Sequence, residues 1–313
     1  KGFYMFCIAL LGGDERQIYL GQILMDAGHT VHFFAIPKDR VEALLGKSIV
    51  KKYKKQMFFH EEEEYGLLSS CDLVLGPIPC TKDQIYLQQT FANKQIPINR
   101  LFQNLSRKNY VIAGMIPDNL KSAMHDRGIQ YYDYIKNTSF SRLNAIATAE
   151  GAISYAINHS SGNLHQSKVL VLGYGLCGTC LAEKCRALMA DVTVTGRREE
   201  TRSLAIRNGM HYLPVNALAT ADDLASYSYI FNTIPDRVLT KEILEKLSFH
   251  CTIVDIASAP GGLDYDYAKK HQLNATLYLG IPGKIAPEAS AQILYDIIVN
   301  QIKERSSLYV SQS

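Results

Sequence analysis

The segment from residue 168 to residue 198 constrains the fold of this chain more than any other segment. It reads as an apolar strand, a glycine-containing turn, a helix and a second apolar strand. The glycines Gly173, Gly175 and Gly178 have the spacing G-x-G-x-x-G. In this spacing the first glycine permits a tight turn, the second lets a pyrophosphate approach the backbone, and the third lets the helix pack closely on the strand. The strand before the turn and the helix after it favour dinucleotide binding over a merely structural turn.

The second strand of this segment ends in Thr195-Gly196-Arg197-Arg198. Sites for NAD usually have Asp or Glu here, which binds the ribose 2′-hydroxyl. A carboxylate would repel a 2′-phosphate, whereas a guanidinium can bind it with two charge-assisted hydrogen bonds. The arginines therefore predict NADP as the cofactor. The alternative is an exposed arginine pair on a loop, and the acidic Glu199 and Glu200 that follow leave that alternative open.

Strands and helices alternate along the rest of the chain, which predicts an α/β protein with largely parallel sheets. We expect strands of the first half at 4–11, 30–36, 72–76 and 110–115. We expect helices of the first half at 14–27, 83–93, 117–127 and 140–159. Strands of the second half are expected at 168–172, 191–195, 228–232, 251–255 and 275–279.

The 313 residues are enough for two domains joined by long helices. A polar, turn-rich segment at 160–168 marks the boundary. We expect an N-terminal α/β substrate and catalytic domain at 1–160 and an NAD(P)-binding Rossmann domain, with a doubly wound parallel sheet, at 161–285. Residues 286–313 would form a helix that packs back on the first domain. Four apolar positions share one face of that helix: Ala289, Ile293, Ile297 and Ile298.

The composition argues against nucleic acid or a membrane as a partner. The chain carries 33 basic and 30 acidic side chains, which is too balanced for a polyanion-binding surface. No apolar stretch reaches membrane-spanning length, and the apolar run at the N-terminus indicates a first strand and not a signal peptide. Cys177, Cys180 and Cys185 lie on one expected helix without a second ligand cluster. We therefore expect no metal site, but buried thiols in a reducing cytosol.

Further motifs follow successive strands in a characteristic order. They read FNTIPDRVL at 231–239, IVDIASAPGGLDY at 253–265 and GIPGKIAPEASAQIL at 280–294. The first half adds LLGGDERQ at 10–17 and AIATAEGAI at 145–153. Together these motifs resemble the A subunit family of bacterial dipicolinate synthase. The resemblance covers most of the chain and is much more specific than the glycine spacing alone.

The resemblance implies an NADP-dependent dehydrogenase that oxidises dihydrodipicolinate, a product of lysine biosynthesis, to dipicolinate (pyridine-2,6-dicarboxylate). It implies action during sporulation, in the cytoplasm of the mother cell of a spore-forming bacterium. It also implies a partner, the B subunit of dipicolinate synthase, which looks like a flavoprotein. The chain departs from the family pattern at Leu176, where an arginine is common, and at Ala259, where a basic residue is common. Arg197 matches a family arginine, and Arg198 is an addition that would compensate for the lost charge.

The motifs also imply where the cofactor lies. We expect it along the glycine turn and at the ends of the strands that follow. The expected contacts are Gly173, Gly175, Leu176, Cys177, Gly178, Arg197, Arg198, Thr233, Ile234, Pro235, Ala257, Ser258 and Pro282.

Oxidation of a dihydropyridine removes one hydride and one proton, so the task of the protein is mainly to place the ring and exclude water. Cations or helix N-termini should meet the two carboxylates of the substrate. In the turn at 10–17, Arg16 and the backbone of Gly13 are expected to bind one carboxylate. The alternative for Arg16 is an exposed side chain in the first helical turn. Asp14 is expected to cap the helix, and Cys80 to serve packing or to line the cleft.

The long helix at 140–159 and the loop after the last strand supply the expected catalytic residues. Glu150 is the best carboxylate for proton removal, with Thr148 and Asn144 as hydrogen-bond donors. An ion pair or a cap explains Glu150 at least as well. Lys284 would meet a carboxylate or act as an acid, and a solvated loop lysine is the alternative.

Two other classes of function stay open. The first is another two-domain NADP dehydrogenase, of the type that acts on shikimate or methylenetetrahydrofolate. The second is a non-catalytic NADP-binding module. It would have no need for the loop at 280–288, and the presence of that loop and of a full first domain argues against it.

Overall fold

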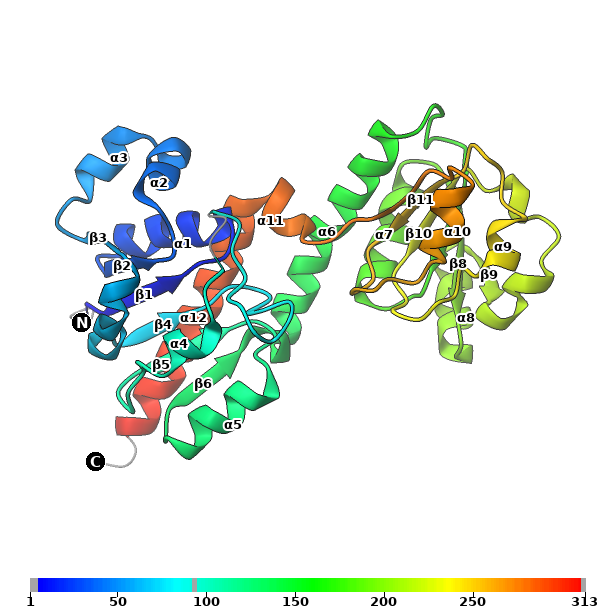
Figure 1. Ribbon diagram of the computed structural model, residues 1–313. Helices are drawn as coiled ribbons and strands as arrows, with labels where there is room; N and C mark the ends of the chain where they lie inside the picture. Colours follow the sequence, from blue (N-terminus) through cyan, green and yellow to red (C-terminus); the bar gives the residue numbers. More distant parts are fainter. Residues whose placement is uncertain (1–4, 92–94, 311–313) are drawn as a thin grey trace. The chain divides into compact units, whose positions relative to one another are not determined.

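Two strands predicted from apolar runs, β1 (Cys7–Leu11) and β7 (Lys168–Leu172), each become a central strand of a six-stranded parallel sheet. The computed structural model describes residues 5–91 and 95–310, with side chains as far as residue 304. The chain forms two compact units, residues 1–140 with 286–313 and residues 141–285 (Figure 1). The expected fold class, α/β with two domains and parallel sheets, is confirmed.

The sheet of the first unit has the strand order β3-β2-β1-β4-β5-β6. Its strands beside β1 are β2 (Thr30–Phe34), β3 (Met57–His60), β4 (Leu73–Leu75), β5 (Tyr110–Ala113) and β6 (Gln130–Asp133). Its helices are α1 (Glu15–Asp26), α2 (Lys38–Leu45), α3 (Lys47–Lys52), α4 (Ile98–Phe102), α5 (Asp118–Asp126) and α12 (Pro287–Val310), with 3-10 turns η1 (Glu62–Ser70) and η2 (Tyr134–Lys136). The strand order reverses between β1 and β4, which makes their carboxyl ends a topological switch point.

The side chains of β1 alternate between two apolar cores because helices cover both faces of the sheet (Figure 1). Ile8 and Leu10 lie in a core with side chains of α1, α2 and α12. Ala9 and Leu11 lie in the other core, with side chains of α4 and α5. Burial on both faces explains why the sequence of β1 is continuously apolar.

The second unit repeats this design with the order β12-β11-β10-β7-β8-β9. Its strands beside β7 are β8 (Asp191–Gly196), β9 (His211–Pro214), β10 (Tyr229–Asn232), β11 (Thr252–Asp255) and β12 (Ala275–Leu277). Its helices are α6 (Thr138–Asn158), α7 (Leu176–Ala187), α8 (Glu199–Arg207), α9 (Lys241–Leu244), α10 (Tyr265–Lys270) and α11 (Ile281–Ile285), with 3-10 turns η3 (Val215–Thr220) and η4 (Leu224–Ser226). Chain order gives the doubly wound Rossmann pattern 3-2-1-4-5-6, with its switch point between β7 and β10.

The strands that the sequence analysis missed, β3, β6 and β9, all lie at an edge of a sheet. Each has several residues that are only partly buried. An edge strand contacts one neighbour and keeps one side open to water, so it needs no continuous apolar run. The sequence signal of a buried parallel strand is therefore weak in all three.

The helix expected at 83–93 is wrong for the described part of that range, and residues 92 and 93 lie outside the described residues. The Asp83 carboxylate accepts hydrogen bonds from the backbone N–H groups of Ile85 and Tyr86. The next donors go to other segments: Leu87 N–H binds the carbonyl of Ile96, and Gln88 N–H binds that of Cys80. An Asp side chain that binds backbone N–H groups competes with a helix, and here it sets up an extended loop.

The domain limits differ from those expected. Residues 141–160 group with the second unit, because Ala149, Ala152 and Ala156 of α6 pack in one core with β7 and α7. Residue 4, the first of the expected strand 4–11, lies outside the described residues. Helix α12 packs on α1 in the first unit. Its buried face contains Ala291, Leu294, Ile297 and Ile298, whereas Ala289, expected on that face, is exposed. Within the described residues, no helix has both the length and the hydropathy needed to cross a bilayer.

Candidate nucleotide-binding site

The three glycines after β7 have three different surroundings. Gly173 has φ +91°, and a Cβ on it would lie 2.4 Å from Thr233 Oγ1. A Cβ on Gly178 would lie 2.1 Å from the carbonyl oxygen of Gly173, so helix α7 packs directly on the turn. Apart from its two neighbours in the chain, a Cβ on Gly175 would meet no described atom within 4 Å. Two glycines therefore serve the fold, and the third leaves open space beside the backbone.

Neighbouring strands hold this turn in place. The buried Thr195 hydroxyl of β8 accepts a hydrogen bond from the Gly173 N–H at 3.0 Å. On the other side, the N–H and the hydroxyl of Thr233 both donate to the carbonyl of Leu172, each at 2.9 Å. The turn is thus fixed between the ends of β8 and β10, at the switch point of the sheet.

Helix α7 begins beside the open space. Gly175 is its N-cap residue, and no described side chain caps the helix there. The first N–H groups of the helix and the positive end of its dipole are therefore available to an anion. Leu176 is exposed, whereas burial raises the pKa of Cys177, so that thiol stays protonated. This arrangement suits a pyrophosphate group.

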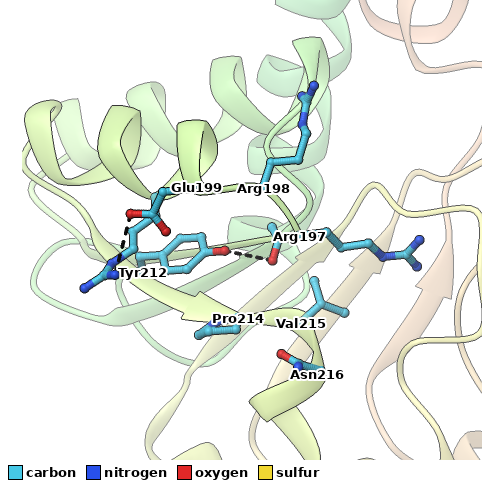
Figure 2. Close-up of a pocket in the computed structure, with 9 residues that line it drawn as sticks. Arg197, Arg198, Glu199, Tyr212, Pro214, Val215 and Asn216 are labelled. Carbon is cyan, nitrogen blue, oxygen red and sulfur yellow. Dashed lines mark hydrogen bonds and ion pairs between the residues drawn. The ribbon is translucent and has the colours of Figure 1, made fainter.

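A pocket of about 760 Å³ opens at the end of β8 (Figure 2). It is lined by Gly196, Arg197, Arg198, Glu199, Arg202, Tyr212, Pro214, Val215 and Asn216. The Tyr212 hydroxyl of β9 donates to the carbonyl of Gly196 at 2.9 Å, which fixes the floor of the pocket. Glu199 pairs with Arg202 at 3.6 Å, so the Glu199 carboxylate already balances one positive charge of the pocket. Three guanidinium groups and one carboxylate leave the pocket net positive.

The two arginines point in different directions (Figure 2). Arg197 Nη2 forms an ion pair with Asp236 Oδ2 at 3.2 Å, and both side chains are more than two-thirds exposed. Arg198 is the N-cap residue of α8, and among the described residues it has no ion-pair partner. Asp236 comes from the loop after β10, so Arg197 reaches across the glycine turn. Because the Arg197–Asp236 ion pair is exposed, it contributes little to stability. Another anion can therefore readily replace the Asp236 carboxylate at Arg197.

A buried carboxylate organises the other half of the strand ends. Asp255 is fully buried at the end of β11 and accepts four hydrogen bonds. The donors are Asn232 Nδ2 at 2.8 Å, Ala257 N–H at 2.9 Å, Gly262 N–H at 2.6 Å and the Tyr265 hydroxyl at 2.6 Å. Burial, and then the hydrogen bond to Asp255, raise the pKa of Tyr265. This network joins the ends of β10 and β11 and shapes the Pro-Gly-Gly loop.

The structure places the expected cofactor residues at the ends of four neighbouring strands. The glycine-turn residues follow β7, and Arg197 and Arg198 follow β8. Thr233, Ile234 and Pro235 follow β10, while Ala257 and Ser258 follow β11. Pro282 lies apart from these, buried in α11 after the edge strand β12.

The glycine turn after β1 is filled by the chain itself. Gly13 N–H donates to the carbonyl of Gln88 at 2.8 Å, and a Cβ on Gly12 would lie 2.7 Å from Leu87 Cδ2. The loop that was expected to be a helix thus covers this turn. The first unit has the same strand order as the second, but described side chains fill the space at its turn that is open at Gly175.

Arg16 is 7% exposed, not an exposed first-turn side chain. Its Nε and Nη2 each bind the Asp14 carboxylate at 2.8 Å, and Nη2 also donates to the carbonyl of Ile78 at 2.7 Å. Asp14 caps α1 by accepting from Arg16 N–H, as expected. Cys80 is fully buried, and burial raises its pKa to about 12, in agreement with its expected packing role. Arg16 binding to a substrate carboxylate stays a prediction, and it would require Arg16 to loosen from Asp14.

The residues expected for catalysis are spread over α6 and α11. Glu150 pairs with Lys184 of α7 at 2.8 Å, the ion-pair alternative that the sequence left open. Thr148 donates its hydroxyl to the carbonyl of Asn144 at 2.8 Å, within α6. Lys284 is exposed, with its Nζ 4.7 Å from the centre of the Tyr278 ring.

Sequence reasoning missed three residues beside the arginine pair: Arg202, Tyr212 and Asp236. Arg202 lies four residues after Arg198, one helical turn further along α8, and this spacing could have found it. Tyr212 lies on a missed edge strand. Asp236 lies in the quoted motif at 231–239, but its pairing with Arg197 depends on the strand order, which brings the ends of β8 and β10 to either side of β7.

The comparisons with known proteins point to one kind of protein. Residues 7–135 match the family model for the N-terminal domain of the dipicolinate synthase A subunit. The A subunit of dipicolinate synthase from Bacillus subtilis (strain 168) is 25% identical over 298 residues, 95% of this chain and 96% of the relative. The chain is thus similar to dipicolinate synthase A subunits over nearly its whole length. The resemblance noted in the sequence is therefore confirmed.

Solved structures show a similar likeness over nearly the whole chain. The A subunit of dipicolinate synthase from Bacillus halodurans has a TM-score of 0.81 at 26% identity, over 96% of this chain and 99% of that chain. A transhydrogenase from Sinorhizobium meliloti has a TM-score of 0.62 at 17% identity, over 94% of each chain. The second likeness is one of fold.

The unequal surroundings of Gly175 and Gly178 predict unequal effects of the same substitution. Gly178→Ser should destabilise the protein by about 1–3 kcal/mol, because its Cβ would overlap a backbone carbonyl. Gly175→Ser should stay within about 0.5 kcal/mol of the unmodified protein, because the site is open and serine is a good N-cap residue. Denaturant unfolding of both variants measures the difference. Equal losses of stability would contradict the packing described.

The Asp255 network predicts a large effect of a small change. Asp255→Asn replaces an acceptor oxygen by an amide that donates, so at least one buried donor loses its partner, at a cost of about 1–3 kcal/mol or more. The exposed Asp236 gives a matched control: Asp236→Asn should change stability by less than about 0.5 kcal/mol. Thermal unfolding of both variants tests this. An Asp255→Asn protein as stable as the control would show that the network does not support the loop.

Proposed function

We propose that the second unit binds NADP and that the chain is an NADP-dependent oxidoreductase. The observation that carries the proposal is the open space at Gly175, at the switch point, beside a strand that ends in arginines. A pyrophosphate would lie against Gly175 and the N-terminus of α7. The relatives named dipicolinate synthase and transhydrogenase support oxidoreductase chemistry for this fold.

The pocket at the end of β8 supports a 2′-phosphate in place of a bare ribose hydroxyl. Arg198 has its guanidinium available, and Arg197 can exchange the Asp236 carboxylate for a phosphate that carries more charge. Arg202 adds a third cation to the same pocket. Asp236 opposes this binding, because its carboxylate competes for Arg197.

For the reaction, we propose oxidation of dihydrodipicolinate to dipicolinate, on the strength of the family. NADP supplies the acceptor for the hydride. The protein holds the ring, excludes water and takes up one proton. Lys284 is proposed to meet a substrate carboxylate, with Arg16, Gly13 and Asn144 as further substrate contacts.

Glu150 is proposed as the proton acceptor, with Thr148 beside it on α6. The Lys184 ammonium now binds Glu150, so proton uptake requires that the pair separate. Both side chains are at least one-third exposed, which makes such a separation inexpensive.

The family also supports a proposed partner and setting. We propose that the chain works with the flavoprotein-like B subunit of dipicolinate synthase. We further propose that it acts in the mother-cell cytoplasm during sporulation, on a branch of lysine biosynthesis.

Nucleotide preference is the direct test of the arginine pocket. NADP should bind more tightly than NAD. Changing Arg197→Ala and Arg198→Ala together should reduce the difference in binding free energy between the two nucleotides by about 1–3 kcal/mol, the scale of charged hydrogen bonds. Asp236→Asn should increase the difference in affinity between NADP and NAD, since it removes the carboxylate that competes for Arg197. Arg207→Ala, at the exposed far end of α8, is the control and should change nothing. Calorimetric titration measures both affinities. Equal affinity of the unmodified protein for NADP and NAD would contradict the NADP proposal.

The reaction is tested by mixing the chain with dihydrodipicolinate and NADP, with and without the B subunit, and following the absorbance of the product. We expect turnover that Gly175→Val abolishes, because its side chain would occupy the pyrophosphate position. Glu150→Gln should lower kcat by tenfold or more at unchanged NADP affinity, on the usual scale of about 10²–10⁴ for a lost general base. Turnover of shikimate or methylenetetrahydrofolate instead would favour another dehydrogenase. Binding of NADP without any turnover would favour a non-catalytic module.

A further inference from the structure

Two cysteine thiols lie in contact at the amino ends of β1 and β4. Cys7 is the first residue of β1, and Cys71 lies two residues before β4. Their sulfur atoms are 3.5 Å apart, although the two residues lie 64 positions apart in the sequence. Asp72 fixes the two backbones together: its N–H donates to the Cys7 carbonyl, and its carboxylate accepts from Cys7 N–H, both at 2.8 Å. The contact between the thiols therefore rests on a fixed part of the sheet.

The two thiols differ in their surroundings. Hydrogen bonds from Cys71 and from His32 lower the pKa of Cys7 to about 5, against the opposing effects of burial and of the Asp72 charge. Cys71 is only 1% exposed, and its hydrogen bond to Cys7, together with burial, raises its pKa. Cys7, by contrast, is partly exposed. The pair thus consists of an accessible thiolate and a buried, protonated thiol.

A histidine pair supports the thiolate. His32 Nδ1 and His60 Nε2 are 2.7 Å apart, and the two rings are stacked at 4.9 Å with 3° between their planes. Burial, and then the charge of His32, lower the pKa of His60. Glu64 lies 3.6 Å from the other nitrogen of His60. In the part of the chain that the structure describes, no group of three or more His, Cys, Asp or Glu side chains is arranged to hold a metal ion.

We propose that Cys7 and Cys71 form a redox-active dithiol that a hydroperoxide converts into a disulfide. The Cys7 thiolate attacks the peroxide, the O–O bond breaks, and Cys7 becomes a sulfenic acid while an alcohol or water leaves. The sulfur of Cys71 then displaces the hydroxyl group from Cys7, forming the S–S bond, and its proton leaves with that group as water. Two thiols lose two electrons, and the hydroperoxide gains them.

The geometry suits this second step. A disulfide bond is about 2 Å long, so the two sulfur atoms must approach by only about 1.5 Å, within the range of side-chain rotation. The bond would close a loop that contains β2, β3 and the helices between them. Closing so long a loop restricts the unfolded chain and should raise the melting temperature of the first unit. Oxidation would thus lock the amino ends of β1 and β4 together.

Another pair of cysteines in the same chain provides an internal control. Cys177 and Cys180 lie three residues apart on α7, and burial raises the pKa of both thiols. They have the i, i+3 spacing that places two side chains on one helix face, but among the described residues no histidine lowers the pKa of either thiol. If proximity in the sequence decided reactivity, this pair would be oxidised first. The proposal predicts the opposite order.

The first experiment measures alkylation of each cysteine in the intact protein by iodoacetamide, followed by peptide mass spectrometry. An ordinary thiol reacts about tenfold more slowly for each pH unit below its pKa, whereas Cys7 should lose less than about threefold between about pH 8 and pH 6. Because a thiolate of low pKa is also a weaker nucleophile, the advantage of Cys7 should appear below about pH 7. His32→Asn should restore the ordinary pH profile, and His125→Asn, at an exposed site on α5, should not.

The second experiment treats the unmodified protein with hydrogen peroxide and maps its cross-linked peptides. The expected result is a Cys7–Cys71 disulfide, reversed by dithiothreitol, with a raised melting temperature and with Cys177 and Cys180 still reduced. Cys7→Ser should leave Cys71 unoxidised, while Cys71→Ser should leave Cys7 as sulfenic or sulfinic acid. An ordinary pH profile of Cys7, a Cys177–Cys180 disulfide formed first, or over-oxidation of Cys7 in the unmodified protein with Cys71 still free would each overturn the proposal. These outcomes do not depend on NADP binding, whose proposed residues all belong to the second unit.

Discussion

The packing of Gly178 against the carbonyl of Gly173 is the contact on which the site depends. It brings the start of α7 to within van der Waals distance of the turn, so the helix axis points at the space beside Gly175. Thr195 and Thr233 then fix the turn from both sides, and this is possible because β8 and β10 flank β7. An anion at Gly175 would meet N–H groups that are already oriented, so little ordering would accompany binding.

The two units show that strand order alone does not make a nucleotide site. Both sheets have the order 3-2-1-4-5-6, and both have glycines after the first strand. In the first unit the donors of that turn are used: Gly13 N–H binds Gln88, and Arg16 binds Asp14. In the second unit Gly175 borders open space. The difference arises from the loop that follows β4, which folds over the turn after β1, whereas no described residue beyond its chain neighbours lies within 4 Å of a Cβ on Gly175.

This loop also marks the limit of prediction from the sequence. Central strands such as β1 and β7 were predictable, because burial on both faces requires continuous apolar runs. The glycine turn was predictable as well. Close contacts require glycine at Gly173 and Gly178, and Gly175 keeps the space beside the backbone open. The loop after β4 was not, because the Asp83 carboxylate and pairing with distant residues decide its shape. The sequence suggested Glu150 as a catalytic residue and could not show its ion pair with Lys184, because that pair depends on how α6 packs beside α7.

In the proposed NADP site, nucleotide selectivity would be a difference between opposing charges, not the effect of arginines alone. Arg197 already has a carboxylate partner in Asp236, so the gain on binding a 2′-phosphate is the excess of phosphate over carboxylate at that guanidinium. Arg198, at the N-terminus of α8, has no carboxylate partner among the described residues that it would have to give up. In the proposed site, Arg198 would therefore have a larger share in selectivity than Arg197. Glu199 weakens this little, because Arg202 already balances it. A chain that kept Arg197 and Asp236 but lacked Arg198 would have nearly neutral surroundings for the 2′ position, and it would distinguish the two nucleotides poorly.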